Sequence, residues 1–228
     1  MYGLIELDVT EPRRLIARAD TDLSFTAYVV ASVAQAASAH PEVHAYRDWR
    51  GRLVTHSHVD ITTMVEIDTT QGKFPLAVVV EDADIRSVAD ITRQLRSAKG
   101  TQRQSGNARF LTAAAMSLTR IPFLATSLFR LGSRSIKARQ RMGTVSVTAI
   151  GMFGAGAGYG FGGSTVYSLT VVVGGLSKAP RIDDGEIQQR DILNLTVTVD
   201  HNMVDGAPAA RFVADLRKAI ESGVVLAT

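Results

Sequence analysis

The spacing of apolar residues limits the fold most, because its period changes repeatedly along the chain. In residues 59–68, apolar side chains such as Val59 and Ile61 alternate with polar ones such as Asp60, which predicts a half-buried strand. In residues 24–39, apolar residues recur at helical spacing and Pro41 closes the segment. The chain therefore contains both strands and helices.

The same two patterns place further elements. They predict strands at residues 4–9, at 74–80 and through 144–200. They predict helices at residues 85–99, from residue 111 to about residue 139, and at 207–222. Glu11-Pro12 predicts a turn, residues 48–51 predict a hairpin and the polar residues 101–110 predict a loop. The elements follow no strict strand-helix-strand rhythm, and the sequence shows no repeat or linker. We therefore expect one α+β domain with a mixed sheet over residues 1–228.

Composition excludes several classes of site. The chain has no cysteine, which rules out thiolate zinc sites, thiol nucleophiles and disulfides, and we expect no metal. The apolar residues 111–131 are interrupted by Arg120 and Pro122, so a pair of buried or amphipathic helices is favoured there over a membrane span. The N-terminus lacks the pattern of a signal peptide. These features predict a soluble, cytoplasmic protein.

The charges are distributed unevenly. The 92 residues between Asp90 and Asp183 contain no Asp or Glu and carry 13 Lys and Arg, whereas the rest of the chain holds 12 basic and 22 acidic residues. Such asymmetry fits contact with a polyanion, which could be nucleic acid, a membrane surface or a phosphorylated cofactor. A solvated basic face, or pairing with acidic parts of this or a neighbouring chain, explains it equally well.

A glycine-rich stretch at residues 151–163 formally matches the spacing G-x-G-x-x-G at Gly158, Gly160 and Gly163. A dinucleotide loop of this kind must open a helix, but the residues that follow are β-branched and strand-like. We therefore interpret the stretch as a mobile or tightly turning hairpin loop, in which glycine allows sharp backbone turns.

Residues 195–212, LTVTVDHNMVDGAPAARF, contain the strongest candidate site. The alternation predicts a strand that runs into His201 and places it on the side of Leu195 and Val197. A histidine on an apolar face is usually a core residue, but partial burial would also keep its ring neutral, as a general base requires. Asp205 precedes the predicted last helix, so it is a natural helix N-cap that could also orient the imidazole.

The hexad from His201 to Gly206 resembles the His-x-x-x-Asp-Gly signature of the coenzyme A dependent acyltransferases. These include chloramphenicol acetyltransferase and the catalytic cores of the dihydrolipoamide acyltransferases of 2-oxo acid dehydrogenase complexes. The flanking VDHNMVDGAPAARF, GTVSVTAIGMFG at 143–154 and HVDITTMVEID at 58–68 resemble core segments in the same order. The similarity covers residues 3–222 and implies a chloramphenicol acetyltransferase-like two-layer sandwich.

The resemblance also implies chemistry. His201 would remove a proton from a thiol or hydroxyl that attacks a thioester, and a strand hydroxyl would donate to the oxyanion, a contribution of ~3 kcal/mol in comparable sites. Thr148 matches that hydroxyl position, with Ser146 as the fallback. The family forms trimers whose active sites lie between subunits. Coenzyme A would serve as acyl-carrying co-substrate, and a basic run before the Thr148 strand would attract its phosphates: Arg134, Lys137, Arg139 and Arg141.

Two departures from the family pattern bear on Asp205. Asn202 replaces the Arg that follows the histidine in dehydrogenase cores, and the chain begins at the first strand without the family's preceding Arg-bearing helix. We therefore expect Asp205 to pair with another Arg or simply to cap its helix.

Three functions follow as hypotheses. The first is a freestanding acyltransferase without lipoyl or subunit-binding domains, which moves a short acyl group between coenzyme A and a small hydroxyl, amine or thiol acceptor. On this hypothesis the acceptor is a small molecule, and neither nucleic acid nor a membrane is an expected partner. The alternative is the core of a 2-oxo acid dehydrogenase complex, which transfers acyl groups between dihydrolipoamide and coenzyme A. The third is a catalytically silent oligomeric scaffold.

Overall fold

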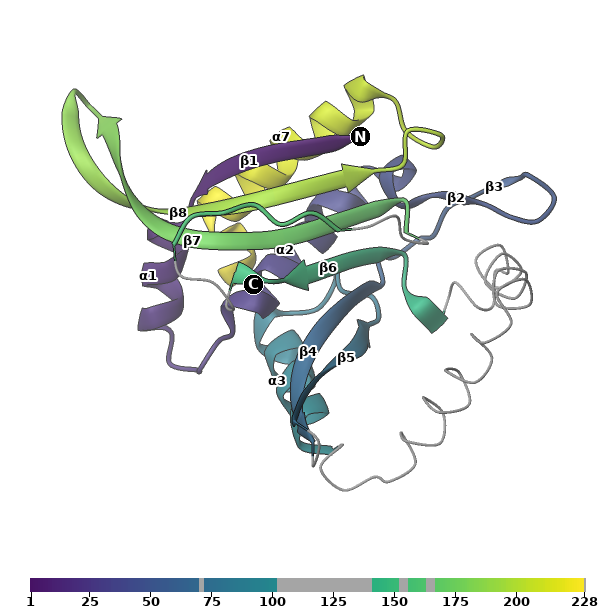
Figure 1. The fold of residues 1–228 in the computed structure, drawn as a ribbon, viewed down its shortest axis with the longest axis horizontal. Coiled ribbons are helices and arrows are strands. Elements are labelled where there is room, and N and C mark those ends of the chain that lie inside the picture. The colour runs from purple at the N-terminus through teal and green to yellow at the C-terminus, as the bar shows by residue number, and fades with distance from the viewer. Residues whose placement is uncertain (70–71, 102–140, 152–155, 163–166, 228) are drawn as a thin grey trace.

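The computed structural model describes residues 1–69, 72–101, 141–151, 156–162 and 167–227 (Figure 1). The strands are β1 (Tyr2–Asp8), β2 (Tyr46–Arg47), β3 (Leu53–Val54), β4 (Ile61–Thr69), β5 (Gly72–Val80), β6 (Val145–Ala149), β7 (Leu169–Asp183) and β8 (Glu186–Val199). The α-helices are α1 (Thr10–Arg18), α2 (Phe25–Ser38), α3 (Val88–Thr101) and α7 (Gly206–Ser222), and two short 3-10 helices cover Pro41–His44 and Val224–Leu226.

Six strands form one mixed sheet in the order β1-β8-β7-β6-β4-β5. β6 runs parallel to both β4 and β7, whereas the remaining neighbours are antiparallel. Helices α2 and α7 lie behind the sheet in Figure 1. The predicted two-layer α+β fold with a mixed sheet is therefore confirmed. β2 and β3 form a separate hairpin at the predicted position.

The hydrophobic core lies between the sheet and the helices. The inner face of the central strands carries fully buried residues in register, such as Val147 of β6 and Val171 of β7. Tyr28 of α2 is fully buried and its hydroxyl donates a hydrogen bond to the carbonyl of Ile220 in α7, which ties the two helices together. Burial raises the pKa of Tyr28 to about 12.

Helix α1 corrects one sequence prediction. Glu11-Pro12 does not form a turn, because both residues lie in the first turn of α1. Proline is tolerated there because its missing N–H would have no partner inside the helix. The Asp8 side chain accepts hydrogen bonds from the backbone N and the hydroxyl of Thr10, at 2.9 and 2.6 Å, and so stabilises the start of the helix.

The predicted loop and helix between residue 102 and about residue 139 lie outside the described residues. Helix α3 itself extends through Gly100 to Thr101, slightly beyond the predicted stop. Within the described part of the chain, no helix is long and apolar enough to cross a membrane.

Candidate functional site

His201 lies in a turn directly after β8, which ends at Val199. Asp200 shapes this turn: its Oδ1 accepts from the backbone N and the Nδ2 of Asn202, both at 2.9 Å, and its carbonyl accepts from Met203 N at 3.0 Å. The His201 side chain is 60% exposed. The prediction of a partly buried ring at the end of the strand is therefore wrong for the single chain, because Asp200 bends the chain out of the strand before His201.

Asp205 occupies the N-cap position of α7, as predicted, but its side chain makes no capping hydrogen bond. Its Oδ1 lies 3.7 Å from the Nδ1 of His201, which is ion-pair range rather than hydrogen-bond distance. The Asp205 side chain is 87% exposed. Only the backbone of Asp205 serves the helix, through its carbonyl, which accepts from Ala209 N at 3.1 Å.

Thr148 and Ser146 lie on the outer face of β6, opposite the helices, and both are half-buried. Thr148 forms no side-chain hydrogen bond with a described residue, so its hydroxyl is available. Thr144, on the same side just before β6, is instead buried, and its hydroxyl is bonded to the backbone N and O of Asp60 at 3.2 Å.

Within one chain the structure does not bring His201 and Thr148 together. Val199 pairs with Leu169, and Leu169 pairs with Val145. Thr148 is therefore displaced from the His201 end of the sheet by three residues of β6, roughly 10 Å, and β6 is separated from β8 by roughly another 10 Å across the intervening β7.

Further hydroxyls line the outer face beside Thr148, and sequence reasoning missed them. Thr196 of β8 follows Val172 in the row that begins with Thr148, and Thr198 lies in the next row. The hydroxyl oxygens of Thr196 and Thr198 are buried without a hydrogen-bond partner among the described residues. The alternation of Thr with Val and Leu in residues 195–199 was the signal for this polar face.

The described part of the glycine-rich stretch, residues 156–162, crosses in front of β7 on this outer face (Figure 1). Gly158 O accepts from Gly175 N at 2.7 Å, and Gly158 N donates to the Asn194 side chain at 3.2 Å. A Cβ at Gly151 would lie only 1.7 Å from the carbonyl oxygen of Gly174. Glycine is therefore required at Gly151 by the close approach of its backbone to β7, and not by the predicted tight turn. Among the described residues, the first regular element after the stretch is the strand β7, whereas a dinucleotide loop opens a helix.

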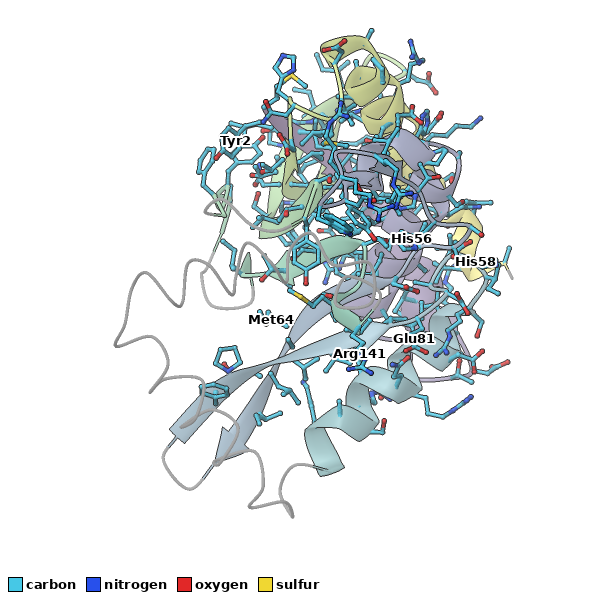
Figure 2. All side chains as sticks on the ribbon, turned by 90° about the vertical axis from the view of Figure 1, so that its right-hand side faces the viewer. Tyr2, His56, His58, Met64, Glu81 and Arg141 are labelled. Carbon is cyan, nitrogen blue, oxygen red and sulfur yellow. The ribbon has the colours of Figure 1, made fainter. Side chains whose placement is uncertain are left out.

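Of the predicted phosphate-binding residues, only Arg141 lies within the described part of the chain; Arg134, Lys137 and Arg139 fall outside it. Arg141 is exposed, and in Figure 2 it lies on the same side of the molecule as Glu81 and His58, far from Tyr2. Among the described residues, no group of three or more His, Asp or Glu side chains could hold a metal ion.

Comparisons with known proteins agree on one family. The family model for the catalytic domain of 2-oxoacid dehydrogenases acyltransferase matches residues 4–109 and 112–227. The dihydrolipoyllysine-residue acetyltransferase component of the pyruvate dehydrogenase complex from Mycoplasma capricolum is 24% identical over 98% of this chain, which spans 45% of that relative's length.

Two solved structures share the fold. The cubic core of the pyruvate dehydrogenase multienzyme complex has a TM-score of 0.71 and 17% identity over 100% of this chain and 84% of that chain. A chloramphenicol acetyltransferase has a TM-score of 0.59 and 14% identity over 96% of this chain and 87% of that chain. The expected chloramphenicol acetyltransferase-like fold is thus confirmed.

Proposed function

Because the chain belongs to the 2-oxoacid dehydrogenase acyltransferase family, by its catalytic domain, we propose that it transfers an acyl group between dihydrolipoamide and coenzyme A. The more general hypothesis, a freestanding acyltransferase with any small acceptor, has weaker support. The Mycoplasma relative is named as a component of a dehydrogenase complex, and this chain spans less than half of that relative's length.

One observation carries the proposal: His201 is presented on an exposed turn that Asp200 holds by hydrogen bonds. In the proposed reaction the ring of His201 takes the proton from the attacking thiol. The resulting thiolate adds to the thioester carbonyl, and the tetrahedral intermediate then releases the second thiolate, to which His201 returns the proton.

Thr148 is proposed to donate a hydrogen bond to the oxyanion of that intermediate. Since Thr148 and His201 lie far apart within a chain, we propose that the donor comes from a neighbouring chain. We therefore propose a trimer-based assembly in which the outer face of one sheet meets the His201 turn of the next chain. The structural likeness to a cubic core supports an assembly of many chains.

Asp205 and the basic residues have supporting roles in the proposal. The Asp205 carboxylate, 3.7 Å from the His201 ring, would stabilise the imidazolium that forms during transfer. Arg141, together with Arg134, Lys137 and Arg139 in the sequence before β6, would attract the phosphates of coenzyme A.

The test is an assay of acetyl transfer from acetyl-coenzyme A to dihydrolipoamide. Replacement of His201→Ala should lower kcat by about 10²- to 10⁴-fold, the usual effect of a general base. His58→Ala is the matched control, because His58 is also an exposed histidine but pairs with Asp84. Equal activity of the His201→Ala variant and the wild type would overturn the proposal.

A further inference from the structure

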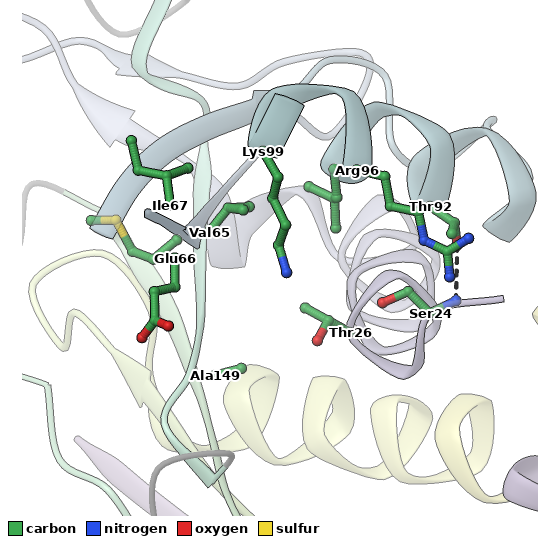
Figure 3. A pocket seen from close by; sticks show the side chains of 11 residues that line it. Ser24, Thr26, Val65, Glu66, Ile67, Thr92, Arg96, Lys99 and Ala149 are labelled. Atoms are coloured by element: carbon green, nitrogen blue, oxygen red, sulfur yellow. Dashed lines mark hydrogen bonds between the residues drawn. The ribbon is translucent and has the colours of Figure 1, made fainter. Parts of the chain in front are cut away.

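A cavity lies where β4 separates from β6. The two strands pair only from Ile61 to Thr63, opposite Val145 to Val147, although β4 continues to pair with β5 as far as Thr69. Beyond Thr63 a cavity of about 450 Å³ opens (Figure 3). It lies between β4, the end of β6 at Ala149, and helices α2 and α3. This volume is within the usual range for small-molecule sites.

One wall of the cavity is apolar. Val65 and Ile67 of β4 and Leu95 of α3 line it, and each is at least nine-tenths buried. Ala149 adds a small apolar surface at the opposite side. The part of this aliphatic wall that stays accessible favours a ligand with a short apolar tail, because contact removes the tail and that remaining surface from water.

The charged side chains around the cavity differ in whether a described residue neutralises them. Arg96 pairs with Asp22 at 2.7 Å, and Glu66 pairs with Lys73 at 2.6 Å. Lys99, in the last turn of α3, points into the cavity in Figure 3 and has no acidic partner among the described residues. Residues 102–140, which follow α3, contain no Asp or Glu. The charge of Lys99 is therefore available to a ligand.

Ser24 and Thr26, at the start of α2, line the same cavity as Lys99 (Figure 3). Ser24 is held in place, because its backbone N donates to Thr92 Oγ1 at 3.1 Å and its Oγ accepts from Ala27 N at 3.5 Å. Thr26 forms no side-chain hydrogen bond with a described residue, so its hydroxyl can donate to a ligand. The cavity lining thus combines a cation, a hydroxyl that no described residue occupies and an aliphatic wall.

We propose that this cavity binds a monoanion with an aliphatic tail. The anionic head would lie between Lys99 and Thr26, and the tail would pack against Val65, Ile67 and Leu95. A single negative charge matches the charge of Lys99. The proposal does not depend on acyl transfer, because the cavity lies away from the His201 of the same chain and its lining residues have no part in the proposed reaction.

The probe is octanoate, titrated by isothermal calorimetry into the full chain. Octanoate should bind, whereas octanol and inorganic phosphate, which each lack one half of the recognised chemistry, should bind at least about tenfold more weakly. Lys99→Gln should weaken octanoate binding about tenfold or more, as expected for loss of a charge-assisted hydrogen bond. Thr26→Val should weaken it in the same direction.

Arg93→Gln is the matched control, because Arg93 lies on the same helix but pairs with Asp90 and does not line the cavity. It should bind octanoate as the wild type does. No binding of octanoate to the wild type, equal binding of octanol, or unchanged affinity in the Lys99→Gln variant would overturn the proposal. Circular dichroism verifies that each variant is folded, and Thr26→Val provides the test should Lys99→Gln not fold.

Discussion

At the scale of single residues, Asp200 holds the turn that carries His201. Its carboxylate fixes Asn202 and its carbonyl fixes Met203 and Val204, so the turn has few other conformations available. Asp200 touches no reacting atom in the proposed reaction, and we propose that it acts by positioning His201. Pre-organisation of this kind affects the rate of the chemical step rather than substrate binding.

We predict that Asp200→Ala lowers kcat for acetyl transfer about tenfold or more while KM changes little, because a misplaced base slows proton transfer. Asp200→Asn keeps the Oδ1 acceptor and should recover most of the activity. Steady-state kinetics on both variants measure the two parameters separately. Equal losses in the Ala and Asn variants would show that the hydrogen-bond acceptor at this position is not what matters.

A second residue-scale prediction concerns pH. His44 is 1% exposed, and burial, followed by the nearby charge of His56, lowers its pKa from 6.5 to about 4. The unfolded chain therefore binds this proton at higher pH than the folded chain does. The neutral His44 ring therefore contributes fully to the free energy of unfolding above pH 6.5. As the pH falls towards 4, the free energy of unfolding decreases by up to about 3 kcal/mol.

Urea unfolding of the wild type and of a His44→Gln variant at several pH values between 4 and 7 tests this prediction. In the variant, the free energy of unfolding should change less with pH than in the wild type, whatever its value at neutral pH. If the free energy of unfolding changed with pH equally in the wild type and in His44→Gln, this pH dependence could not be assigned to His44.

The residue scale also shows what the sequence could reveal about the site. Motif spacing singled out His201, Asp205 and Thr148 as candidates, because a hexad and a strand segment can be compared position by position, and their roles stay predictions. Strand parity failed at His201, since the hydrogen bonds of Asp200 override the alternation that precedes it. The sequence pattern did not mark the hydroxyls of Thr196 and Thr198 as part of the candidate site, because threonine is also an ordinary strand residue.

At the scale of elements, the start of β6 depends on Gly143. This residue has φ +78°, and a Cβ there would lie 2.7 Å from Thr62 Oγ1 and 3.0 Å from the carbonyl oxygen of Asp60. Gly143→Ala should therefore lower the free energy of unfolding by roughly 1–3 kcal/mol from backbone strain, with a further cost from crowding.

Gly185→Ala is the matched control for that prediction. Gly185 has φ +81° in the turn between β7 and β8, but no atom lies within 4 Å of the position that a Cβ would take. This variant should incur only the cost of backbone strain. Thermal or denaturant unfolding should therefore show a smaller decrease in the free energy of unfolding than for Gly143→Ala. A Gly143→Ala variant as stable as Gly185→Ala would mean that β6 moves to accommodate the methyl group.

Most elements were predictable because periodicity depends on which face each residue buries. The predicted segments at 24–39, 59–68 and 207–222 correspond to α2, β4 and α7. Helix α1 was missed because its apolar residues are few and Pro12 was interpreted as a turn residue, although proline is also common in the first turn of a helix.

At the scale of the whole molecule, the sequence predicted a mixed sheet but not its strand order. The order β1-β8-β7-β6-β4-β5 results from long-range pairing, which no local pattern encodes. This order places β6 and β8 on either side of β7, and so separates Thr148 from His201. If Thr148 and His201 act in one site, as proposed, the two residues would come from different chains.

The most direct test of this account is an assay of mixed subunits. We predict that the His201→Ala and Thr148→Ala variants each transfer acetyl groups poorly on their own. When the two are unfolded together, refolded and assembled, some interfaces should combine the intact His201 of one chain with the intact Thr148 of another, and activity should return. No recovery of activity in mixed assemblies, with the oligomeric state confirmed by light scattering, would contradict a site shared between chains.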